Sequence, residues 1–121
     1  MRRLVITAAA RRDIQQALWT SEDRHGDAAA RRYRTLIDFA IKEIRQSPDR
    51  PTSKSAQIAD LRLFPLKLSA RRLPANQVVR TAPHVLVYRF DDDSVEVVRL
   101  LHAAMDLPRH LAAEGESPSL G

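Results

Sequence analysis

The sequence predicts an α+β fold, in which an N-terminal strand and a helical hairpin pack on a mainly antiparallel sheet of three to four strands, with a short C-terminal helix. Three observations lead to this prediction. Apolar residues recur at helical spacing in two consecutive segments before residue 48, a glycine separates these segments, and two runs rich in Val, Leu, Tyr and Phe flank an acidic turn near residue 92. Helices that precede strands in this way are typical of a sheet whose helices lie on one face.

The N-terminal half contains a short strand and the two helices. Leu4–Ile6 is the strand candidate, and Thr7 is placed to cap a helix that begins at Ala8. Gly26 interrupts the helical pattern, and Asp27 can cap the second helix. The apolar face of the first helix consists of Ala10, Ile14, Ala17 and Leu18. The apolar face of the second helix consists of Ala29, Tyr33, Leu36, Ile37, Ala40 and Ile44.

The middle of the chain alternates between irregular segments and one strand. Pro48 and Pro51 end the second helical pattern, and residues 49–59 are predicted to form a loop. Leu61–Leu68 has strand character, although Pro65 places this strand at an edge or at a bulge. A second irregular segment, over residues 69–83, leads to the last strands.

The last strands form the clearest hairpin in the sequence. Val85–Phe90 and Ser94–His102 flank the turn Asp91–Asp93, and both faces of these strands are mostly apolar, which predicts central positions in the sheet. The short C-terminal helix is expected within Met105–Leu111. We therefore expect a single domain over residues 1–111, followed by a flexible tail over residues 112–121, which carries no periodicity.

Composition narrows the functional classes. The chain has no cysteine, which excludes disulfides and thiolate metal sites. No apolar run approaches the roughly 20 residues of a membrane span, and Met1-Arg2-Arg3 leads directly into a strand, so we expect a cytoplasmic protein without membrane contacts. The net charge is +5, and residues 61–90 contain six basic residues and no acidic one. This local excess predicts an anionic partner, although basic surface loops also serve simple solubility.

Several of these segments, taken in order, resemble the ParE branch of the RelE/ParE toxin superfamily. The resemblance begins with Thr7, Ala10, Asp13-Ile14, Leu18-Trp19, Gly26, Ala30, Tyr33 and Pro48. It continues with Leu61-Arg62-Leu63-Phe64-Pro65-Leu66, Val85 to Tyr88, Val95 to His102, and Met105 to Leu111. One departure is the connection Lys67–Pro83, which is longer than the family pattern.

The resemblance implies a function as well as a fold. Members of this superfamily are toxins of bacterial toxin-antitoxin pairs, and ParE toxins are neutralised by ParD-like antitoxins whose N-terminal parts bind operator DNA. The toxin itself would therefore meet operator DNA only indirectly. ParE toxins are described as inhibitors of DNA gyrase, whereas RelE relatives cleave mRNA on the ribosome. We expect a gyrase inhibitor that acts by binding, and the alternative is a ribosome-dependent mRNA endonuclease.

Candidate site residues follow from these two hypotheses. For a target or antitoxin interface, the candidates are Trp19, Arg62, Lys67, Arg71, Arg72, Arg89, Arg99 and Arg109. For a toxin that acts by binding, no catalytic residue is expected. If the protein is a nuclease, the suspects are Tyr88, His102 and His110. No cofactor and no metal are expected, because Asp91–Asp93 is explained by turn chemistry and no phosphate-binding glycine motif is present.

Overall fold

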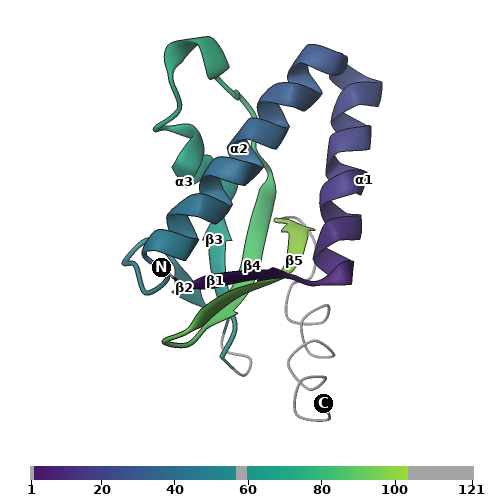
Figure 1. Cartoon of the computed structure of the whole chain (residues 1–121). Helices are drawn as coiled ribbons and strands as arrows, with labels where there is room; N and C mark the ends of the chain where they lie inside the picture. The colour runs from purple at the N-terminus through teal and green to yellow at the C-terminus, as the bar shows by residue number, and fades with distance from the viewer. Residues whose placement is uncertain (1, 57–59, 104–121) are drawn as a thin grey trace.

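The computed structural model describes residues 2–56 and 60–103 (Figure 1). Its elements are β1 (Arg3–Ile6), α1 (Ala8–His25), α2 (Asp27–Gln46), β2 (Lys54–Ser55), β3 (Arg62–Pro65), α3 (Leu66–Ala70), the 3-10 turn η1 (Ala75–Gln77), β4 (His84–Phe90) and β5 (Ser94–His102). The predicted α+β architecture, with a strand and a helical hairpin before the sheet, is confirmed. The expected helix within Met105–Leu111 and the tail lie outside the described residues. Among the described helices, none is long and apolar enough to cross a bilayer.

The sheet has five strands in the order β1-β5-β4-β3-β2. Strand β1 pairs with β5 in parallel, and all other neighbours are antiparallel. The count exceeds the three to four strands expected from the sequence, because Lys54 and Ser55, within the predicted loop, pair with Leu63 and Arg62. A strand of two residues is too short to produce a detectable alternation in sequence.

Local sequence signals fix the start of α1 and the turn between α1 and α2. Thr7 caps α1 as predicted, because its Oγ1 accepts a hydrogen bond of 3.0 Å from the Ala10 N–H. Gly26 separates the helices with φ +90° and ψ 174°, a conformation that favours glycine. The predicted cap at Asp27 is wrong, since Gly26 itself occupies the cap position and Asp27 is the first helical residue.

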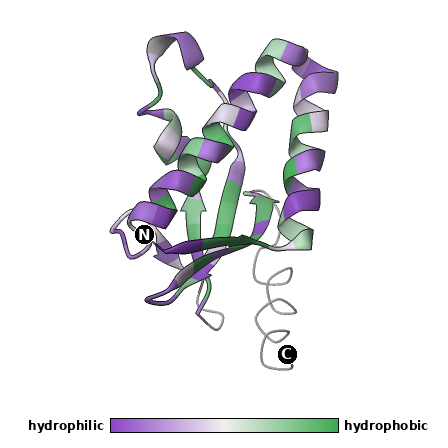
Figure 2. Ribbon diagram, in the orientation of Figure 1, coloured by the Kyte–Doolittle hydropathy of each residue, from purple (hydrophilic) through white to green (hydrophobic). Residues whose placement is uncertain are grey.

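The hairpin covers one face of the sheet, and the second face is also buried. Figure 2 shows largely hydrophobic strands beneath helices of alternating character. The main core joins helix and strand residues, which include Tyr33, Leu36, Ile37, Ile44, Phe64, Leu86, Tyr88, Val95 and Val97. A smaller cluster on the sheet consists of Leu61, Val87, Val98 and Leu101. The prediction that β4 and β5 are central strands with two apolar faces is therefore confirmed.

The predicted strand Leu61–Leu68 is only partly correct. The strand ends at Pro65, and the next five residues form α3. Pro65, still extended with φ −66° and ψ 132°, pairs with Val85 and is also the N-cap of this helix, so the chain leaves the sheet directly after it. Leu66 and Ser69, three residues apart, both face inward and are fully buried. The leucines in Leu66-Lys67-Leu68 are compatible with a strand or with a helix. The helix forms because this segment packs against α2.

Candidate functional site

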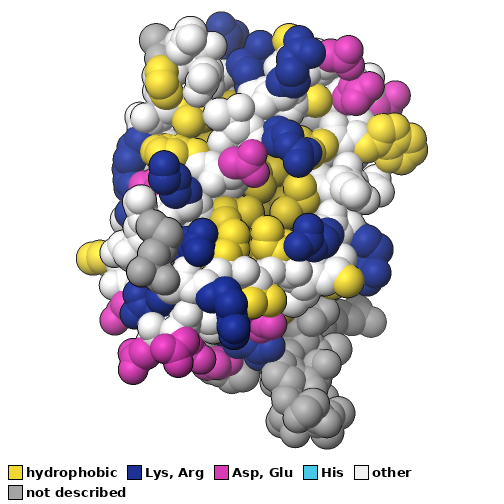
Figure 3. Space-filling model, viewed as in Figure 1, with side chains coloured by type: hydrophobic (Ala, Val, Ile, Leu, Met, Phe, Trp, Pro, Cys, Tyr) yellow, Lys and Arg dark blue, Asp and Glu magenta, His cyan; other side chains and the backbone are white. Residues whose placement is uncertain are grey.

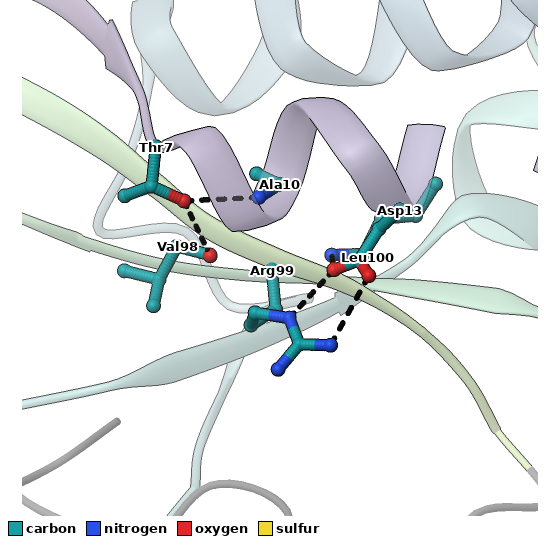
Figure 4. A network of polar contacts seen from close by, with 6 residues as sticks. All are labelled: Thr7, Ala10, Asp13, Val98, Arg99 and Leu100. Atoms are coloured by element: carbon teal, nitrogen blue, oxygen red, sulfur yellow. Dashed lines mark hydrogen bonds and ion pairs between the residues drawn. The ribbon is translucent and has the colours of Figure 1, made fainter. Parts of the chain in front are cut away.

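One carboxylate joins the helical hairpin to the end of the sheet (Figure 4). Asp13 on α1 accepts hydrogen bonds from Arg99 on β5, with Nε at 2.6 Å and Nη2 at 3.1 Å. The same carboxylate accepts a bond of 3.0 Å from the Leu100 backbone N–H. At the N-cap of the same helix, Thr7 Oγ1 donates to the Val98 carbonyl at 2.7 Å. These contacts fix α1 against β5, and both oxygens of Asp13 are already engaged within the fold.

Two histidines and a tyrosine meet beside this pair. His84 opens β4, His102 closes β5, and the two residues are direct cross-strand partners whose rings lie 5.5 Å apart, centroid to centroid. Tyr33 on α2 places its hydroxyl oxygen 2.6 Å from His84 Nδ1. The two strand ends and α2 thus bring together residues that are 51 positions apart in sequence.

Burial determines the protonation of this cluster. The pKa of His84 is lowered from 6.5 to about 4, chiefly by desolvation and also by the neighbouring His102, while Asp13 acts in the opposite direction. Desolvation also raises the pKa of Tyr33, so the phenol keeps its proton. At neutral pH both groups are therefore uncharged, and a hydrogen bond between neutral partners joins the Tyr33 hydroxyl to Nδ1 of His84.

The cluster lines a hollow of about 630 Å³ between the C-terminal end of α1 and the ends of β4 and β5. A second hollow of about 760 Å³ lies between the start of α2 and the segment before β4. Ser21, His25, Tyr33 and Thr81 line both hollows. Four arginines line the two hollows, namely Arg24, Arg32, Arg80 and Arg99, and Asp13 is the single acidic residue among the lining positions. The surroundings are therefore positive and rich in hydroxyl groups.

The acid-free segment predicted as an interface finds acidic partners elsewhere in the fold. Arg62 lies 3.2 Å from Asp49 and donates to Ser53 Oγ at 2.9 Å. Arg72 pairs with Glu43, a buried residue of α2. Both arginines therefore have counter-charges within the fold, although residues 61–90 contain no acidic residue, because the acids come from α2 and from the loop after it.

Glu43 gathers further contacts from α3 and its surroundings. It accepts a hydrogen bond of 2.5 Å from Ser69 Oγ, and Arg50 lies 3.5 Å away. Together with Arg72, these contacts fasten the start of the connection Lys67–Pro83 to α2. Glu43 thus connects α2 to α3 and to the residues around α3. The periodic pattern of α2 does not predict this role.

The remaining interface candidates divide into paired and exposed residues. Arg89 pairs with Glu96 at 2.5 Å, and Arg99 pairs with Asp13. Lys67 and Arg71 are exposed, and no carboxylate within residues 2–56 and 60–103 pairs with either. Trp19 is 67% exposed on α1. Arg109 lies outside the described residues.

Cationic side chains are not confined to the segment singled out by the sequence. Figure 3 shows Lys and Arg side chains spread around a hydrophobic patch on the face that carries α1 and α2. The exposed cations of these helices include Arg11, Arg12, Arg24, Arg31, Arg32, Arg34 and Lys42. The helical hairpin is therefore a second positive surface, which the linear charge count does not reveal because acidic residues are interspersed along both helices.

The nuclease suspects have different environments. Tyr88 is fully buried, and its hydroxyl donates to the Pro48 carbonyl at 2.6 Å, so it cannot reach a substrate. His102 is exposed and lines the first hollow. His110 lies outside the described residues. In the described part of the chain, no group of three or more His, Asp or Glu side chains is arranged to hold a metal ion.

Sequence reasoning missed the contact between Tyr33 and His84 and the arginines around the hollows. Tyr33 falls on the apolar stripe of α2, which predicts core packing and gives no sign of a polar partner on β4. Arg24, Arg32 and Arg80 belong to three different segments, and only the fold brings them to one region. No local motif marks this arrangement.

Comparison with known proteins agrees with the fold and with the resemblance. The family model for the ParE toxin of the type II toxin-antitoxin system, parDE, matches residues 4–107. The chain is also similar to a solved structure of the chromosomal ParDE TA system from P. aeruginosa, with a TM-score of 0.64 and 15% sequence identity over 84% of this chain and 96% of that chain. At this identity the likeness concerns the fold. No curated protein sequence matches. Because the family model spans most of the chain, the protein belongs to the ParE toxin family.

Proposed function

We propose that this ParE toxin acts in the bacterial cytoplasm by binding and inhibiting DNA gyrase, and that a ParD-like antitoxin neutralises it. The family match over residues 4–107 carries this proposal, because it covers every described helix and strand apart from Arg3, the first residue of β1. Any effect on operator DNA is indirect, through the DNA-binding part of the antitoxin.

The chemistry of the described residues favours binding over catalysis. Tyr88 is sealed in the core, and the pKa of His84 is lowered to about 4, far from the value near 7 that suits a general acid or base at neutral pH. Arg89 and Arg99 are paired with carboxylates. They are therefore less able to stabilise the negative charge that develops on a phosphate in the transition state of RNA cleavage. Exposed groups such as Trp19 and Arg71 suit a contact surface.

A supercoiling assay with purified gyrase tests the proposal. The toxin alone is expected to reduce supercoiling or to trap cleaved DNA, and the addition of the ParD-type antitoxin is expected to restore activity. A folded toxin that leaves both supercoiling and cleavage unchanged would contradict the gyrase proposal. Circular dichroism of the same sample establishes that the protein is folded.

The alternative is a ribosome-dependent mRNA endonuclease, and one observation favours it. His84, His102 and Tyr33 line the first hollow beside Arg99, so imidazoles, a phenol and a guanidinium lie around one opening. Cleavage of mRNA on purified ribosomes by the wild type, lost in His102→Gln but retained in Tyr88→Phe, would support it. Absence of cleavage together with gyrase inhibition would exclude it.

A further inference from the structure

The two hollows near the turn between α1 and α2 adjoin each other. Ser21, His25, Tyr33 and Thr81 line both of them, so the hollows meet along a shared wall. Their volumes, about 630 Å³ and 760 Å³, fall within the range of about 300–1,000 Å³ that ligand sites in proteins occupy. Together they have room for an elongated small molecule with one end in each hollow.

The first hollow offers aromatic rings and apolar surface. Tyr33, His84 and His102 line it, and each ring meets the next edge to face, with centroids 5.6 Å and 5.5 Å apart. Leu100 and Leu101 lie on the same lining. A flat heterocycle matches these surroundings, because its ring can pack on other rings and on aliphatic carbon while its edge forms hydrogen bonds.

The second hollow offers cationic and hydrogen-bonding groups. Arg32 on α2 and Arg80 before β4 are exposed lining residues, and no carboxylate in the described part of the chain pairs with either. Asn76 and Thr81 add side-chain donors. Among the described residues that line this hollow, none is acidic. Guanidinium groups bind phosphate oxygens through paired hydrogen bonds, so this end suits a chain of phosphates.

The carboxylate on the lining of the first hollow does not oppose an anionic ligand. Both oxygens of Asp13 already accept hydrogen bonds from Arg99 and from the Leu100 N–H. Arg24, at the end of α1, adds a cation to the same lining, and no carboxylate within residues 2–56 and 60–103 pairs with it. Positive charge therefore exceeds negative charge around both hollows.

We propose that the two hollows bind a free nucleoside triphosphate, with the base against the rings of the first hollow and the phosphates against Arg32 and Arg80 in the second. The hydroxyl groups of Ser21 and Thr81, on the shared wall, are placed to donate to the sugar and to the first phosphate. An inorganic polyphosphate would leave the rings uncovered, and a nucleoside would leave the arginines without a counter-charge. The inference is independent of the cellular target, because it concerns binding by the toxin alone.

Titration calorimetry of the full-length toxin with ATP, GTP, CTP and UTP, each in a separate experiment, tests the inference. We expect at least one of the four to bind with a Kd below about 1 mM. Inorganic triphosphate and the matching nucleoside are each expected to bind at least about tenfold more weakly than the complete nucleotide. Absence of binding by all four nucleotides would overturn the inference. Inorganic triphosphate that binds as tightly as the nucleotide would also overturn it, since charge alone would then account for binding.

Two double substitutions locate the phosphates. Arg32→Gln with Arg80→Gln removes two cations from the second hollow, whereas Arg11→Gln with Arg34→Gln removes two at exposed helix positions that line neither hollow. The first variant is expected to lose at least about tenfold in nucleotide affinity and the second less than about threefold. Equal losses would contradict the inference. Thermal melting establishes that both variants are folded.

A single substitution keeps the inference testable if the double variant does not fold. Thr81→Val replaces an exposed hydroxyl group on the shared wall by a methyl group of similar size. We expect it to weaken nucleotide binding by about threefold to tenfold, because one hydrogen bond is lost. Unchanged affinity in Thr81→Val would contradict a ligand that lies across both hollows.

A competition experiment distinguishes a free nucleotide from a strand of nucleic acid. A single-stranded DNA of eight nucleotides is added to the toxin loaded with the tightest-binding nucleotide. We expect the strand to displace the nucleotide only at concentrations above those of the free nucleotide itself. Displacement at lower concentrations would overturn the inference, because the hollows would then serve a polymer.

Discussion

Asp13 connects α1 to β5 through three hydrogen bonds. Its carboxylate receives two donors from Arg99 and one from the Leu100 backbone, and the side chains of Asp13 and Arg99 are 17% and 21% exposed. A paired charge at this depth stabilises chiefly because removal of one partner leaves polar groups without their acceptor.

We expect Asp13→Ala to lower the free energy of unfolding by about 2 kcal/mol, because Arg99 and the Leu100 N–H lose an acceptor in a partly buried place. Urea denaturation measures this change. Asp13→Asn is the matched control, since it keeps the volume and one acceptor oxygen and is expected to cost less. A stability of Asp13→Ala equal to that of the wild type would mean that the contact is replaced by water without loss.

His84 gives the molecule a pH-dependent stability. The pKa of His84 is 6.5 in the unfolded chain and about 4 in the folded protein, because burial disfavours the imidazolium. Between these values the unfolded chain binds the extra proton. The contribution of His84 is therefore fully present above pH 6.5 and is lost as the pH falls toward 4.

Thermal melting at a series of pH values measures this dependence. The melting temperature is expected to decrease on acidification over this interval, and more steeply in the wild type than in His84→Gln, whose side chain does not titrate and can still accept a hydrogen bond from Tyr33. Identical pH profiles for the two proteins would show that another group controls the acid transition.

At the level of elements, Gly26 decides how α1 turns into α2. Its φ of +90° and ψ of 174° lie in a region that residues with a Cβ adopt at a cost of about 1–3 kcal/mol. Apart from Gly26 itself and its two chain neighbours, no heavy atom lies within 4 Å of the position that a Cβ would take, so the cost is backbone strain without a steric clash. Gly26→Ala is therefore expected to lower the unfolding free energy by about 1–3 kcal/mol while the helices and the antitoxin interface stay intact.

Chemical denaturation together with far-ultraviolet circular dichroism checks this prediction. Ala28→Gly on the exposed first turn of α2 is a useful comparison, because it costs helix propensity without changing the turn. If Gly26→Ala were as stable as the wild type, the chain would have to relax at the turn, and the left-handed conformation would not be required.

Elements whose signals lie within a few neighbouring residues could be predicted from the sequence. Elements that form only through contacts with distant residues could not. The cap at Thr7, the break at Gly26, the two helical periods and the hairpin around Asp91–Asp93 are all encoded within a few neighbouring residues. Strand β2 exists only because β3 pairs with it, and α3 forms because α2 offers it a packing surface.

In the candidate site, too, local features could be predicted from the sequence and contacts between distant residues could not. The exposure of Trp19 agrees with its position beside the apolar stripe of α1, which a helical wheel predicts. The partners of Arg62 and Arg72 come from residues that a linear charge count places in another segment. The two hollows join residues of α1 and α2, of the connection Lys67–Pro83 and of two strands, so no single stretch of sequence contains their signature.

For the whole molecule, net charge governs the approach of a partner. The chain carries a formal net charge of +5 at pH 7, and its exposed cations extend over the helical hairpin (Figure 3). We expect the affinity for the ParD-type antitoxin to fall as the salt concentration rises from about 0.05 to 0.5 M, since exposed charges are screened within roughly 10 Å at 0.1 M.

Calorimetric titrations at several salt concentrations measure the slope of this dependence. The double variant Arg32→Glu with Arg80→Glu, at two arginines that line the second hollow, is expected to show a smaller slope than the wild type, because fewer attractive charges remain to be screened. An affinity that does not change with salt would mean that apolar contacts alone hold the antitoxin.

The parallel pairing of β1 with β5 has a consequence for the order in which the molecule can fold. Thr7 and Val98, which are joined by a hydrogen bond, are 91 residues apart in sequence. The first strand to leave the ribosome must therefore wait for the last described strand before its edge of the sheet can close. Contacts of such long sequence separation slow folding, because much chain entropy is lost before they form. This edge of the sheet can therefore close only after nearly all of the described residues have been synthesised.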